Sequence, residues 1–90
     1  MTTEDRYYYV RQSAFHLGLS LRDWNRAAVR GAVYATALFL GRDVYPMPDA
    51  KVSLRRIDDL FRRLVWGLEN NNAEVVNDTV DRMVVAAGLV

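Results

Sequence analysis

Residues 53–69 read SLRRIDDLFRRLVWGLE and carry the clearest periodic pattern of this 90-residue chain. Apolar side chains recur there every three or four positions, at Leu54, Ile57, Leu60, Phe61, Leu64 and Leu68. This spacing places them on one face of an α-helix, and the Arg and Asp side chains between them fall on the other faces. Ser53 is a typical N-cap residue, because its hydroxyl can accept a hydrogen bond from a free amide of the first turn. The stretch therefore predicts an amphipathic helix that begins after Ser53.

The segment after this helix predicts another one. Residues 70–72 are three asparagines, and Asn71 followed by Glu74 matches an N-cap with its N3 partner. The inward positions that helical spacing predicts are Val76, Val80, Met83, Val84 and Ala87. Many residues of this segment are β-branched and weaken helix propensity. A strand over residues 83–90 is therefore the alternative to a helix that continues to the end.

On the N-terminal side, residues 42–52 predict a loop, because the YPMPD sequence at residues 45–49 contains two prolines. Before the loop, Ser20 begins a helix that Gly41 ends. Between residues 27 and 40 only Arg30 is charged, which predicts that this helix is buried on most sides. A four-residue spacing of small side chains would let another backbone approach closely. These side chains are Ala27, Gly31 and Ala35.

The first helix begins near residue 2 or 3, where Thr2 or Thr3 can cap it, and Gly18 predicts its end. Its inward stripe consists of Tyr7, Val10, Ala14 and Leu17. Together these segments predict an all-α fold, a compact four-helix domain over residues 1–90 in which the helix over residues 20–40 is the buried central one.

Composition excludes several classes of site. The chain is 51% hydrophobic and 26% charged, which is the composition of a folded domain. It contains no cysteine and one histidine, so disulfides, thiolate catalysis and a histidine-rich zinc site are excluded. No glycine-rich phosphate loop is present. We therefore expect no cofactor and no metal. The N-terminal residues lack the apolar region of a secretory signal, and the longest apolar run is too short for a membrane span. A cytoplasmic protein without a membrane partner is the expectation.

Catalysis receives little support from the sequence. Ser13 and His16 stand one turn apart on the first predicted helix, but nothing marks an orienting residue or an oxyanion hole. The acidic pairs at residues 58–59 and at residues 78 and 81 lie on faces that helical spacing exposes to solvent. We therefore predict that the protein is not an enzyme and has no small-molecule substrate.

The corner between the first two predicted helices resembles a bacterial helix-turn-helix. Ala14 permits close packing and Gly18 supplies the turn in such a motif. On the helix that follows, Arg residues at intervals of four share one face that could meet phosphates or guanine edges. This resemblance implies a DNA-binding regulator as the alternative function. Its predicted contacts are Ser20, Arg22, Asn25, Arg26 and Arg30.

Charge is distributed unevenly, although the formal net charge is only +1. Residues 1–63 carry a net charge of +4, and residues 64–90 carry a net charge of −3. Bulk charge therefore does not predict nucleic-acid binding, but a local basic surface is compatible with it. The two surfaces could also pair with each other in a dimer or attract different partners.

The leading prediction is a non-enzymatic protein–protein interaction module, which acts as an adaptor, an inhibitor or an assembly protein. Its size and its lack of a catalytic motif suggest a phage or mobile-element protein. A 90-residue chain buries a limited share of its surface, so we expect a homodimer or a higher oligomer, with the apolar area supplied by the second and fourth predicted helices. The expected partners are a second copy and another protein. The predicted anchors are Tyr7, Tyr8, Tyr45 and Met47, with Arg62 and Arg63 at the rim.

Overall fold

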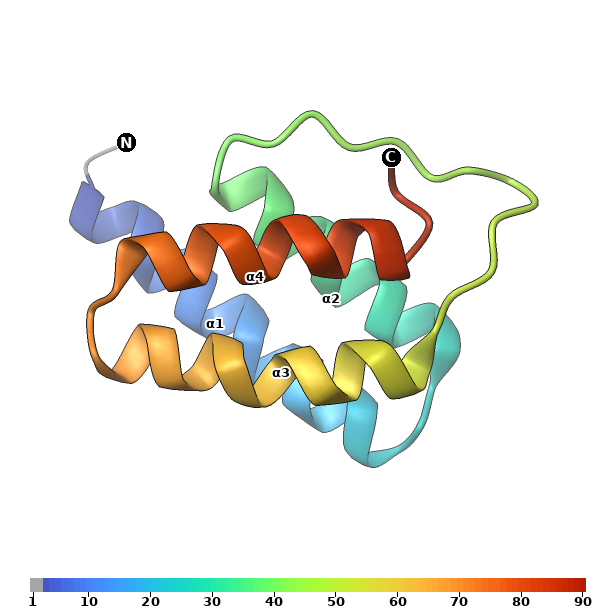
Figure 1. Cartoon of the computed structure of the whole chain (residues 1–90), viewed down its shortest axis with the longest axis horizontal. Helices are drawn as coiled ribbons and strands as arrows, with labels where there is room; N and C mark the ends of the chain where they lie inside the picture. The colour runs from blue at the N-terminus through green and yellow to red at the C-terminus, as the bar shows by residue number, and fades with distance from the viewer. Residues whose placement is uncertain (1–2) are drawn as a thin grey trace.

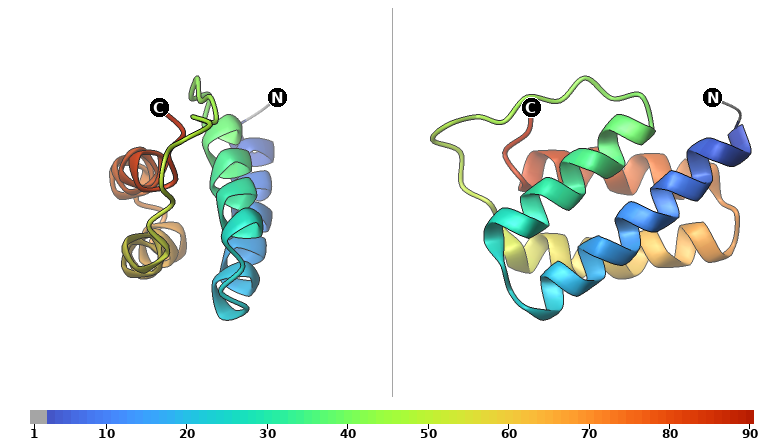
Figure 2. Two further views of the ribbon diagram at one scale, coloured as in Figure 1. Left: turned by 90° about the vertical axis from the view of Figure 1, so that its right-hand side faces the viewer. Right: turned by 180° about the vertical axis from the view of Figure 1, so that it is seen from behind.

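The computed structural model describes residues 3–90, and this part of the chain forms four α-helices (Figure 1). They are α1 (Thr3–Arg22), α2 (Arg26–Phe39), α3 (Leu54–Glu69) and α4 (Ala73–Ala86). Helices α1 and α2 form one antiparallel hairpin and α3 and α4 form another. The two hairpins pack as two layers, and the α1–α2 layer runs obliquely across α3 and α4 (Figure 2). The prediction of a compact all-α domain with four helices is confirmed.

The core lies between the two layers and draws on all four helices. The large side chains that are fully buried there include Leu17, Val33, Ile57, Leu64 and Met83. The inward stripe predicted for the segment after residue 71 is buried, and so is most of the stripe over residues 54–68, apart from Leu60 and Phe61, which are half-buried. Periodicity therefore located the inner faces of α3 and α4 correctly.

Polar side chains cap the starts of α3 and α4, close to where the sequence predicted them. Ser53 caps α3, and its hydroxyl accepts a hydrogen bond from the amide of Arg56 at 3.4 Å. Asn72 caps α4, with its side-chain oxygen 3.1 Å from the amide of Val75, so the predicted cap at Asn71 is wrong by one residue. Asn71 instead has a φ of +51°, which asparagine tolerates better than most residues. The predicted caps at the start of α1, Thr2 and the Thr3 side chain, lie outside the described residues.

The predicted corner at Gly18 is wrong, because α1 continues through this residue to Arg22. Gly18 lies where α1 approaches α3 closely, and a Cβ atom there would lie only 2.9 Å from Cζ of Phe61. Ser20 caps no helix, and its hydroxyl donates to the carbonyl of His16 at 2.8 Å within α1. The chain turns at residues 23–25 instead, where Trp24 has a φ of +53° and Asn25 caps α2.

Helix α2 is not a buried hub. It packs against α1 and, on one side, against α4, but its remaining surface is open. Ala27, Ala28, Gly31 and Leu38 are exposed along that surface. The prediction failed mainly because Ala27, Ala28 and Gly31 are apolar but carry little side-chain area, so leaving them in water costs little free energy.

The end of the chain is neither a continuous helix nor a strand. Helix α4 stops at Ala86, and Gly88 then adopts a φ of +68°. The following residue, Leu89, is buried against the segment over residues 40–53, which we call the α2–α3 loop. The amides of Tyr45 and Met47 donate to the carbonyls of Leu89 and Gly88, each at 3.0 Å. Residues 87–90, which we call the C-terminal segment, are thus held against the loop by backbone hydrogen bonds.

Two buried threonines lead to opposite predictions. The Thr36 hydroxyl lies 2.8 Å from the carbonyl of Ala32 and 2.8 Å from the hydroxyl of Ser13, whereas the Thr79 hydroxyl has no partner among residues 3–90. Thr79→Val should raise the free energy of unfolding by about 1 kcal/mol, because it removes an unsatisfied buried polar group. Thr36→Val should lower it by about 1 kcal/mol. Urea denaturation measures both, and a destabilising Thr79→Val would contradict the assignment of an unpaired hydroxyl.

Candidate functional site

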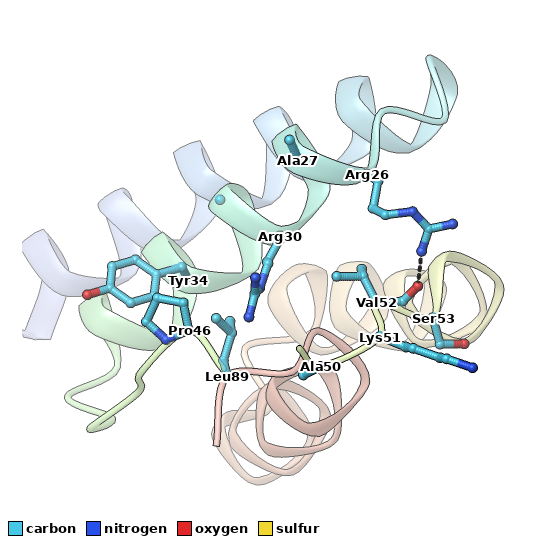
Figure 3. Close-up of a pocket in the computed structure, with 11 residues that line it drawn as sticks. Arg26, Ala27, Arg30, Tyr34, Pro46, Ala50, Lys51, Val52, Ser53 and Leu89 are labelled. Carbon is cyan, nitrogen blue, oxygen red and sulfur yellow. Dashed lines mark hydrogen bonds between the residues drawn. The ribbon is translucent and has the colours of Figure 1, made fainter. Parts of the chain in front are cut away.

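A groove lies between the N-terminal half of α2 and the α2–α3 loop (Figure 3). Its volume is about 900 Å³. On the α2 side its walls are Ala27, Gly31 and Tyr34, and on the other side they are mainly loop residues together with the C-terminal segment. These are Pro46, Ala50, Val52 and Leu89. The groove is therefore apolar along most of its length, and we call it the α2–loop groove.

Three basic side chains also line the α2–loop groove, and no acidic residue does. They are Arg26, Arg30 and Lys51. Arg26 extends from the first turn of α2 and donates a hydrogen bond to the carbonyl of Val52 (Figure 3). Lys51 is exposed beside it on the loop. The charged part of the groove is thus uniformly positive.

Arg30 has a different role from Arg26 and Lys51. Its Nε donates to the carbonyl of Ala87 at 3.0 Å, and its Nη2 lies 2.9 Å from the carbonyls of both Met47 and Gly88. The carbonyls of Ala87 and Gly88 directly follow the C-terminal end of α4, where the helix dipole is negative. Arg30 therefore binds α2, the loop and the C-terminal segment together and forms the back of the groove.

The predicted nucleic-acid contacts do not share one helix. Ser20 and Arg22 belong to α1, and Arg26 and Arg30 belong to α2, so the prediction that one helix begins at Ser20 and includes all of these residues is wrong. Asn25 lies in the turn, where its side chain accepts a hydrogen bond from the amide of Ala28 at 3.1 Å. The guanidinium groups of Arg26 and Arg30 are directed to backbone carbonyls, whereas that of Arg22 lies on an exposed position of α1.

The predicted partner contacts are spread over three elements. Tyr7 is half-buried against the core and Tyr8 is exposed, both on α1. Tyr45 and Met47 are exposed on the α2–α3 loop, although their amides hold the C-terminal segment. The predicted rim residues, Arg62 and Arg63, lie on α3.

Arg63 is engaged within the protein, since its Nη1 lies 2.6 Å from a carboxylate oxygen of Asp78 on α4. This hydrogen bond lowers the pKa of the Asp78 carboxyl, and desolvation opposes it. The positive charge of Arg82 also lowers this pKa. Because the pKa of Asp78 is lower in the folded protein than in the unfolded chain, its ionised carboxylate stabilises the fold at pH values above the unfolded-state pKa. This stabilisation is lost as the pH falls through the folded-state pKa.

The effect of Arg63 on Asp78 can be measured directly. Arg63→Met should raise the pKa of Asp78 toward its ordinary value, because it removes the hydrogen bond that lowers this pKa most. An NMR titration of the carboxyl carbon measures this pKa. Arg62→Met, on the neighbouring exposed position, should leave it unchanged. An unchanged Asp78 pKa in Arg63→Met would contradict the assignment.

Sequence reasoning missed a second apolar surface. Tyr8, Phe15 and Leu19 are 57%, 63% and 40% exposed on the side of α1 that faces away from the core. We call these three residues the α1 stripe. Their spacing of seven and four is a helical period of its own, opposite to the stripe of Val10, Ala14 and Leu17. That second period was the available signal, but a helical period alone does not show which of two apolar stripes faces the core.

The Ser13 and His16 pair does not form a nucleophilic site. Ser13 is buried, and its hydroxyl donates to the carbonyl of Val10 at 2.9 Å and accepts a hydrogen bond from Thr36. His16 is exposed. Within residues 3–90, no group of three or more His, Cys, Asp or Glu side chains is placed to hold a metal ion. None of the helices in this range is long and apolar enough to cross a membrane.

Comparisons with protein-family models, with curated proteins and with solved structures gave no match. The functional interpretation therefore depends on the α2–loop groove and the α1 stripe.

Proposed function

We propose that the protein is a non-enzymatic protein–protein interaction module that associates with a second copy of itself. The observation that carries this proposal is the α1 stripe. Isolated domains rarely leave several large apolar side chains exposed in one row, and such patches commonly mark protein interfaces. Tyr8, one of the predicted anchors, belongs to this row, and Phe15 is its most exposed member.

The spacing along α1 favours a second copy of α1 as the occupant. Tyr8, Gln12, Phe15 and Leu19 follow one another at intervals of four, three and four, which is the pattern of a coiled-coil seam. In an antiparallel pair, Tyr8 of one copy would lie opposite Leu19 of the other. The same arrangement would place Glu4 of one copy near Arg22 of the other, so the ends of the two helices would be complementary in charge.

The contacts of Ser13 support a non-enzymatic role, since its hydroxyl is engaged between α1 and α2. A DNA-binding role remains the alternative, but no contact described above favours it. Apart from Arg22, the proposed α1 pairing and a DNA-binding surface use different residues. They can therefore be separated by substitution.

Sedimentation velocity with a double variant tests the proposal. The unaltered protein should form a dimer as its concentration rises through the micromolar range, and Phe15→Ser with Leu19→Ser should weaken the association about 100-fold or more, because it removes most of the apolar area of the seam. Both side chains are exposed, so the fold should persist, which circular dichroism verifies. Trp66→Ser, another exposed aromatic position on α3, is the matched control and should leave the association unchanged. A double variant that dimerises like the unaltered protein would overturn the proposal.

A further inference from the structure

The α2–loop groove combines an apolar interior with cations that have no carboxylate partner. Among residues 3–90 the ion pairs are Arg42–Asp81, Arg63–Asp78 and Arg82–Asp78, so Arg26, Arg30 and Lys51 are in none of them. The walls between these cations are apolar. A ligand that fits such a groove needs an apolar part and a negative charge at a defined distance from it.

The two cations able to bind such a charge lie at one end of the groove. Arg30 is engaged by three backbone carbonyls, whereas Arg26 uses one donor on Val52 and Lys51 is exposed. This end is where α2 and α3 begin, side by side (Figure 1, Figure 2). Neither first turn contains an acidic residue, so no carboxylate within these turns offsets the positive ends of the two helix dipoles.

Further charges surround this end. Arg55 and Arg56 are exposed in the first turn of α3, and acidic residues occur nearby in sequence at Asp23 in the α1–α2 turn and at Asp49 in the loop. The basic residues exceed the acidic ones, so the electrostatic potential at this end favours an anionic partner.

We propose that the α2–loop groove binds a short acidic segment of another protein. An apolar side chain of the segment enters between α2 and the loop, against Gly31 and Val52, and its Asp or Glu side chains pair with Arg26 and Lys51. This inference rests on the proposed role as an interaction module, but it concerns a different surface from the α1 stripe.

Two other occupants fit the groove less well. A nucleic acid would need cations distributed along its backbone, whereas the walls of this groove are apolar and its accessible cations lie at one end. A second copy of this chain could offer the acidic face of its α4, but two carboxylates of that face, Asp78 and Asp81, already pair with its own arginines. A separate acidic partner therefore satisfies the groove better than either.

Gly31 allows the groove to be blocked without disturbing the fold. A Cβ atom added at Gly31 would have no neighbour within 4 Å, so a leucine there can project into the groove. Replacing a glycine inside a helix also favours the helical state. Ala28→Leu is the matched control, because Ala28 is exposed on α2 but lines a different, smaller groove beside α1.

The probe is a phage-displayed library of random peptides selected on the full protein, followed by fluorescence anisotropy with the enriched peptides as labelled synthetic copies. We expect enriched peptides that carry Asp or Glu beside Leu, Phe, Met or Trp. Gly31→Leu, and separately Arg26→Glu with Lys51→Glu, should weaken their binding about tenfold or more, whereas Ala28→Leu and Arg6→Glu, at an exposed position of α1, should change it less than about twofold.

Three results would overturn the inference. They are a library without enrichment, enriched peptides without acidic residues, and binding that survives both Gly31→Leu and the double charge reversal. A further outcome is that duplex DNA binds more tightly than every enriched peptide and loses this binding in Arg26→Glu with Lys51→Glu. That result would identify nucleic acid, and not an acidic peptide, as the ligand of the groove. Self-association is measured separately. A monomer that binds the peptides through the groove would support this inference and contradict the α1 pairing. A dimer that binds no peptide would support the α1 pairing and contradict this inference.

Discussion

Replacing Gly88 by valine should lower the free energy of unfolding by about 2–4 kcal/mol. Gly88 has a φ of +68°, a conformation that costs a residue with a side chain about 1–2 kcal/mol. A Cβ atom at this position would also lie only 2.5 Å from the Cβ atom of Ala50 in the α2–α3 loop. The loop would have to move away, which would loosen the hydrogen bond from the Met47 amide to the Gly88 carbonyl. Urea denaturation measures the change.

Gly41 provides the matched control for Gly88. Its φ is +75°, but a Cβ atom there would have no neighbour within 4 Å. Gly41→Val should therefore lower the free energy of unfolding by about 1–2 kcal/mol only, since it has the backbone cost without the steric one. Equal losses in the two variants would contradict the close contact between the C-terminal segment and the loop.

Replacing Arg30 by methionine should lower the free energy of unfolding by about 2 kcal/mol, because a charged hydrogen-bond donor to three backbone carbonyls is lost. Methionine keeps much of the side-chain length and its apolar packing. The loss should be concentrated in the α2–α3 loop and the C-terminal segment. Faster hydrogen exchange of the Tyr45 and Met47 amides, which pair with that segment, would report it locally.

Arg22→Met is the control for Arg30, because both arginines belong to the face that sequence spacing had grouped together. Arg22 is exposed on the last turn of α1, so its replacement should change stability by about 0.5 kcal/mol or less. If the two variants lose the same stability, or if exchange of the Tyr45 and Met47 amides is unaltered in Arg30→Met, the role of Arg30 in holding the loop is wrong.

The sequence predicted those features of the fold that depend on local spacing. The stripe over residues 54–68 located α3 and its inner face, and Ser53 marked its start. The corner at Gly18 was missed because glycine serves both turns and close packing. The choice between them depends on Phe61, a residue 43 positions away that no local pattern reveals. The one-residue error at Asn71 has a simpler reason, since three successive asparagines are chemically equivalent as caps.

Less of the candidate site could be predicted. The loop prolines indicated an extended segment, but not that it would lie beside α2 and the C-terminal residues. Arg30 bonds to carbonyls up to 58 positions away, so its structural role was invisible in a pattern that treated Arg22, Arg26 and Arg30 alike. The α1 stripe was predictable in principle from its own period. It was missed because an exposed apolar stripe has the same helical period as a buried one.

Pairing of α1 with α1 of a second copy is tested most directly by cross-linking, because the chain contains no cysteine that could interfere. Glu4→Cys and Arg22→Cys are prepared as separate single variants and treated with a short bis-maleimide, alone and as an equimolar mixture. Antiparallel pairing predicts covalent dimers in the mixture and few in either variant alone. A mixture that yields no covalent dimer at high micromolar concentration would contradict the proposed self-association through α1, and dimers of Glu4→Cys with itself would contradict its antiparallel arrangement.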